Sequence, residues 1–63
     1  MKTLTRRDAR ILTRLTNDDN FMRRARALAA EHGPEAVAED VARRLRLRKF
    51  VALGAVELAT GQY

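Results

Sequence analysis

The sequence predicts an all-α fold, a compact bundle of three to four short helices in which residues 1–63 form a single small domain. Three observations support this prediction. Apolar residues recur at helical spacing, capping residues separate the apolar stretches, and the charges of one helix are sorted toward the ends that its dipole favours. A chain this short buries only about 60% of its unfolded surface, so we expect a second subunit or another partner to support it.

The first helix is expected to begin at a capping box and to run to about Leu15. The Thr5 hydroxyl can accept from the backbone of Asp8, and the Asp8 carboxylate can accept from the backbone of Thr5. The apolar residues that follow share one helical face: Ile11, Leu12 and Leu15. A basic stripe occupies another face at i, i+4 and i+8: Arg6, Arg10 and Arg14.

Residues 16–20 end the first helix and supply caps and first-turn aspartates for a second. The second helix carries a stripe at i, i+4, i+7, i+8 and i+11: Phe21, Ala25, Leu28, Ala29 and His32. Gly33 is expected to close this helix in a left-handed conformation, and Pro34 suits the first position of a third helix.

The third helix is expected to bury one apolar face: Val37, Ala38, Val41, Ala42 and Leu45. Its acidic residues come early and its basic residues late, with Arg43, Arg44, Arg46, Arg48 and Lys49 all assigned to the end of the helix. This order predicts ion pairs at i, i+4 between Glu39 and Arg43 and between Asp40 and Arg44.

Residues 50–59 are apolar at every position except Glu57, and three structures fit them. They could form a separate helix, a continuation of the third helix or a short strand, and their three alanines and two leucines favour a helix. Gly54 costs about 1 kcal/mol there relative to alanine, which predicts a kink or a close backbone contact. The other helices are rich in alanine, so we expect a homodimer or another partner to cover this segment through five residues: Phe50, Val51, Leu53, Gly54 and Leu58.

The residue types argue against catalysis. The chain has no cysteine and no serine, and its one histidine, His32, suits the last turn of a helix. We therefore expect no enzyme, no cofactor, no metal site and no small-molecule substrate. The apolar run is half the length of about 20 residues that crosses a bilayer, and no signal peptide is evident, so we expect no membrane association and a cytoplasmic location.

The net charge of +5, with eleven arginines and two lysines, leaves two function classes open. The first is a small regulatory DNA-binding protein that contacts phosphates through six cations: Arg6, Arg10, Arg14, Arg43, Arg46 and Lys49. A helix-turn-helix is disfavoured, because Pro34 restarts a helix where the turn after Gly33 should continue. The second is a protein-interaction module, an adaptor or inhibitor of the phage or plasmid type, that docks its apolar segment and arginines on an acidic partner protein.

Overall fold

The structure is a computed structural model that describes residues 3–61, and these residues form an all-helical bundle without strands. The helices follow in the order α1 (Arg6–Thr16), α2 (Asp19–His32), α3 (Pro34–Leu45) and α4 (Lys49–Thr60). The prediction of an all-α bundle is confirmed. Residues 50–59 belong to a separate helix, neither to a strand nor to a continuation of the third helix.

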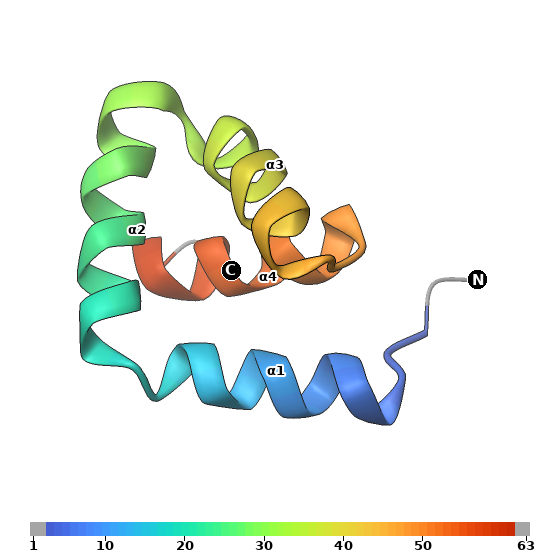
Figure 1. The fold of residues 1–63 in the computed structure, drawn as a ribbon. Helices are drawn as coiled ribbons and strands as arrows, with labels where there is room; N and C mark the ends of the chain where they lie inside the picture. Colours follow the sequence, from blue (N-terminus) through green and yellow to red (C-terminus); the bar gives the residue numbers. More distant parts are fainter. Residues whose placement is uncertain (1–2, 62–63) are drawn as a thin grey trace.

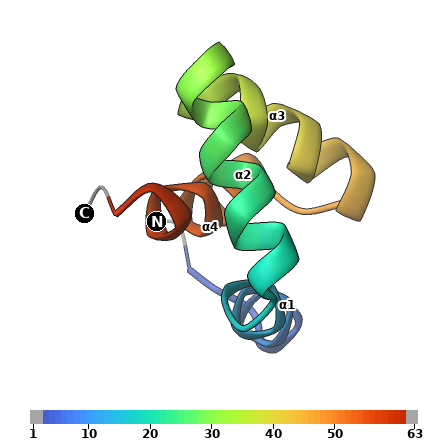
Figure 2. The same ribbon diagram turned by 90° about the vertical axis from the view of Figure 1, so that its left-hand side faces the viewer.

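α4 lies against all the other helices, because it packs on α1, α2 and α3 in turn. Figure 1 shows α2 crossing one end of α1, α3 returning from the far end of α2, and α4 lying behind the α2–α3 pair. The view turned by 90° shows α4 on one side of that pair and α1 at its base (Figure 2). One side of the α2–α3 pair is thus covered by α4, and the other side faces outward.

The core is built around α4 and is rich in alanine. One cluster joins α2, α3 and α4, and a second joins α1 and the α3–α4 connection to α4. The inward side of α4 is at most 2% exposed at five positions: Val51, Ala52, Ala55, Val56 and Ala59. Small side chains at a contact let helix axes approach closely, so three short neighbours suffice to bury this face.

Local sequence signals fix the helix ends largely as expected. The capping box of α1 is present, with the Thr5 hydroxyl accepting from the Asp8 N–H at 3.0 Å and the Asp8 carboxylate accepting from the Thr5 N–H at 3.1 Å. Asp18 caps α2, and Pro34 is the first residue of α3. Gly33 has a φ of 89° but a ψ of 151°, so it joins the helices in an extended glycine conformation and not in the expected left-handed helical one.

The basic block after Ala42 is divided between two helices. α3 ends at Leu45, Arg46 adopts a left-handed conformation as its C-cap, and Arg48 is the N-cap residue of α4. The assignment of Arg46, Arg48 and Lys49 to the end of the third helix is therefore wrong. Because α3 ends at Leu45, the chain can reverse over the next residues and α4 can pack against α3.

Asp8 ties the start of α1 to this reversal. It is the one buried charged side chain within residues 3–61, 3% exposed, and it forms an ion pair with Arg48. Arg48 also donates to the Thr3 carbonyl at 2.7 Å. Arg7 of α1 donates to the carbonyls of Leu45 and Arg46 at 3.4 and 3.3 Å. The hydrogen bonds from Arg48 and from the Thr5 backbone favour the ionised carboxyl and hold the pKa of Asp8 below its usual value of 3.8.

Asp8→Asn should reduce the acid sensitivity of the fold. Because the pKa of Asp8 is lower in the folded than in the unfolded chain, its contribution to stability is complete above the unfolded value of about 4 and is lost as the pH falls through the folded value. Urea unfolding at a series of pH values should show the wild type losing stability below about pH 4 more steeply than Asp8→Asn.

Arg48→Gln removes the partner of Asp8 and should flatten the same pH profile. Arg43→Gln is the control, because it removes only an exposed contact with Asp40 at 3.4 Å, and it should keep the wild-type profile. An Asp8→Asn profile identical to that of the wild type would show that this ion pair does not contribute to acid sensitivity.

Gly54→Ala should stabilise the protein. Gly54 lies within α4 at an ordinary negative φ, and a Cβ built there meets no atom of its surroundings within 4 Å. The close backbone contact expected from the sequence is thus absent among the described residues. The substitution should raise the free energy of unfolding by about 1 kcal/mol, which is an increase in Tm of about 4–8 °C for a domain of this size.

Gly33→Ala is the matched comparison in the same thermal unfolding experiment. Its positive φ with an extended ψ is a conformation that essentially only glycine adopts, so alanine should destabilise the fold by about 1–3 kcal/mol. A loss of stability in Gly54→Ala comparable to that in Gly33→Ala would contradict the prediction.

Candidate interaction surface

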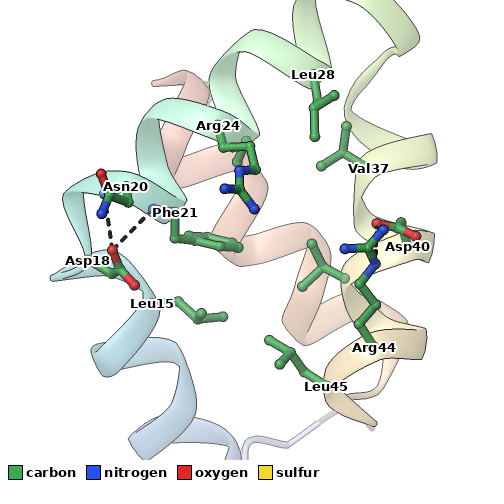
Figure 3. Close-up of a pocket in the computed structure, with 12 residues that line it drawn as sticks. Leu15, Asp18, Asn20, Phe21, Arg24, Leu28, Val37, Asp40, Arg44 and Leu45 are labelled. Carbon is green, nitrogen blue, oxygen red and sulfur yellow. Dashed lines mark hydrogen bonds and ion pairs between the residues drawn. The ribbon is translucent and has the colours of Figure 1, made fainter.

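An open groove of about 590 Å³ lies on the outward side of the α2–α3 pair (Figure 3). We call it the α2–α3 groove. Its floor is largely apolar and comes from α1, α2 and α3: Leu15, Phe21, Ala25, Leu28, Val37, Val41 and Leu45. Polar and charged residues stand along its rim: Asp18, Asn20, Arg24, Asp40 and Arg44.

The groove follows from the way α2 and α3 divide their apolar residues. Ala25 and Ala29 of α2 and Val37 and Ala38 of α3 are buried in the cluster with α4. Phe21 and Leu28 of α2 and Val41 and Leu45 of α3 line the flank of that contact, toward the side where no helix lies. Each helix therefore has an apolar stripe that is wider than its neighbouring helices cover.

Two leucines show that the groove is incompletely covered. Leu28 is 36% exposed and Leu45 is 39% exposed, and both line it. The expected burial of Leu45 is therefore wrong, and Leu28 belongs to the apolar stripe of α2 without being covered. Periodicity identifies the apolar stripe of a helix but not which part of the stripe a neighbour covers, so the groove was not predicted from the sequence.

The expected apolar interface residues lie on two sides of α4. Val51 faces the core and is 2% exposed, so its side chain is not available to a partner in this structure. Phe50, Leu53, Gly54 and Leu58 are partly exposed on the outer side, which also carries Glu57. The three other helices thus cover more of α4 than its composition indicated, and Phe50 and Leu53 also pack against the core clusters.

The three expected cations of α1 have no side-chain partner among the described residues. Arg6, Arg10 and Arg14 are exposed, and within residues 3–61 they form no ion pair or side-chain hydrogen bond. They stand at i, i+4 and i+8 on the side of α1 away from its buried residues Asp8 and Leu15. α1 therefore presents a row of uncompensated positive charge.

The remaining expected cations are partly engaged inside the protein. Arg43 contacts Asp40 at 3.4 Å, and Lys49 lies 3.4 Å from Glu39 and 3.8 Å from Glu35. The predicted pair of Asp40 with Arg44 is present at 3.0 Å, whereas Glu39 pairs with Lys49 in place of Arg43. Arg46 is exposed at the end of α3. The six expected cations therefore do not form one group of unpaired charges, because Arg43 and Lys49 already contact carboxylates.

The helix connections do not place a DNA recognition helix on the surface. Gly33 alone separates α2 from α3, which is shorter than the turn of a helix-turn-helix. The connection between α3 and α4 spans residues 46–48, a suitable length, but α4 would then be the recognition helix. Its inward side is buried and its outer side carries apolar residues and Glu57. Lys49 at its start is its one cation, and that side chain already lies near Glu39 and Glu35.

Two kinds of feature are absent from residues 3–61. No helix there is both long and apolar enough to cross a membrane. Histidine, aspartate and glutamate side chains do not gather there in groups of three or more that could hold a metal ion.

No protein-family model matches the chain, no curated protein matches its sequence, and no solved structure matches it.

Proposed function

We propose that this chain is a non-enzymatic binding module that takes apolar side chains of a partner protein into the α2–α3 groove. The observation that carries the proposal is the largely apolar floor, with Leu28 and Leu45 more than a third exposed at a groove of about 590 Å³. An apolar groove between two helices suits the apolar face of a third helix, a common form of peptide recognition. The proposal keeps the protein-interaction class expected from the sequence but moves the docking surface from α4 to the groove.

Binding of duplex DNA along α1 is a second proposal. Its support is the row of exposed arginines, Arg6, Arg10 and Arg14, which lack partners among the described residues. Contacts of this kind reach phosphates and give affinity without sequence reading. A regulatory role would then depend on a partner that supplies specificity.

Self-association through α4 remains a prediction. Its support is the partly exposed outer side of that helix, where Phe50, Leu53 and Leu58 lie around Gly54. A two-fold pairing of these surfaces would bury the same residues on both copies. This surface is distinct from the α2–α3 groove, which contains none of these residues.

Glutamate substitutions at Leu28 and Leu45 test the groove. Random peptides of about 16 residues, long enough for roughly four helical turns, are selected by display on the immobilised wild-type protein. The affinities of the enriched peptides are then measured by fluorescence anisotropy. Leu28→Glu and Leu45→Glu should each weaken binding by about 10-fold or more, because a buried leucine contributes about 1.5–3 kcal/mol.

Leu4→Glu is the matched control. Leu4 is 46% exposed but lies outside the groove, so its substitution adds the same charge at a comparable site and should leave peptide affinity unchanged. Far-ultraviolet circular dichroism checks that all three variants remain helical. Equal affinities for wild type, Leu28→Glu and Leu45→Glu, or enrichment of no apolar peptides, would exclude the groove as the docking site.

Two triple variants test the α1 proposal at equal change of charge. One replaces Arg6, Arg10 and Arg14 by alanine, and the other replaces Arg43, Arg44 and Lys49, which contact carboxylates. Binding of a labelled duplex should weaken steeply with salt in the wild type, and the α1 triple variant should lower the slope of log affinity against log salt by up to about 3. Equal effects of the two variants, or no duplex binding at low salt, would count against α1 as the contact surface.

A further inference from the structure

Arg24 is the cation of the α2–α3 groove that has no counter-ion among the described residues. It extends from α2 into the groove (Figure 3), and it forms no ion pair or hydrogen bond with the residues that the structure describes. The other cation of the rim, Arg44, lies 3.0 Å from the Asp40 carboxylate, which also contacts Arg43. A docked segment would therefore meet one guanidinium without a counter-ion above an apolar floor.

The carboxylates of the rim are already engaged. Asp18 caps α2, where it accepts from the backbone N–H groups of Asn20 and Phe21 at 3.0 and 3.2 Å. Asp40 is shared between two arginines. The Asp18 charge faces the positive end of the α2 dipole, and the Asp40 charge is balanced by its arginines. Arg24 is therefore the charge of the rim that has no nearby counter-charge, and its position suits an acidic side chain of a partner.

The form of the groove indicates what kind of segment this is. α2 and α3 diverge from their junction at Gly33, and their side chains line the two walls (Figures 1 and 3). The apolar face of a helix presents side chains at i, i+3 or i+4, and i+7, a spacing that suits such a groove. A carboxylate on the flank of that helix would lie at the rim, where Arg24 projects.

We infer that the occupant of the groove is an amphipathic helix from an acidic partner protein, with its apolar face on the groove floor and a carboxylate paired with Arg24. The inference rests on the proposed function and adds the charge of the partner. The net charge of +5 favours encounter with an acidic protein. A second copy of this chain carries the same net charge and lacks this long-range attraction.

The charge of selected peptides tests the inference. Peptides of about 16 residues are selected from a random display library on the wild type and, separately, on Arg24→Glu. We expect peptides selected on the wild type to combine apolar residues at helical spacing with aspartate or glutamate beside them. The best of these should bind Arg24→Glu about tenfold more weakly than the wild type, since the reversal replaces an attraction by a repulsion.

Arg23→Glu is the matched control, because Arg23 is an exposed neighbour on the same helix that does not line the groove. Its effect on peptide affinity should be small. Replacing the critical acidic residue of the peptide by lysine should restore binding to Arg24→Glu and weaken binding to the wild type, which measures the coupling of the two groups directly.

The outcomes separate the inference from the proposed function. Apolar peptides without enriched acidic residues, or equal losses in Arg24→Glu and Arg23→Glu, would overturn the inference and leave the groove as a docking site. No apolar peptides, or peptides that bind Leu28→Glu as tightly as the wild type, would overturn both. Selection of basic peptides that bind the wild type more tightly than Arg24→Glu would overturn the inference, because the partner would then be basic.

Discussion

Burial of α4 is the constraint on which the rest of the structure depends. A helix that is apolar on nearly every side is stable only where neighbours cover it, and this short chain offers three helices to do so. Their alanines allow close approach, so the inward residues Val51, Ala52 and Val56 are almost completely buried. This coverage commits one flank of α2 and one flank of α3 to α4, and the apolar residues on their other flanks remain open as the α2–α3 groove.

The same arrangement divides the arginines into two groups. Arg7 and Arg48 hold the start of α1 against the reversal between α3 and α4, through backbone carbonyls and the buried Asp8. Arg26 donates to the Ala59 carbonyl near the end of α4 at 3.1 Å. These side chains complete helix ends and join distant segments. Arg43 and Arg44 pair with Asp40. The arginines without a side-chain partner among residues 3–61 lie along α1, at Arg23 and Arg24 of α2, and at Arg46 after α3, and at these positions the charge is available to a partner.

Sequence reasoning succeeded where the cause of a feature is local. The capping box at Thr5, the cap at Asp18 and the start of α3 at Pro34 each depend on residues within one turn, and all were predicted or included among the predicted caps. It failed where the cause is distant in the chain. The pairing of Asp8 with Arg48 joins residues 40 positions apart, and the exposure of Leu28 depends on the side of α2 that α4 occupies.

The groove and the α1 arginines are separate surfaces with different physical requirements. α1 contributes Leu15 to the groove but none of the arginines Arg6, Arg10 or Arg14. Binding in the groove depends mainly on apolar burial, with one charge selecting the partner, and is expected to tolerate salt. Binding along α1 would depend on phosphate contacts and would weaken steeply with salt. Salt dependence therefore distinguishes the two surfaces even in an assay that detects only total binding, and a negative result at one leaves the other proposal intact.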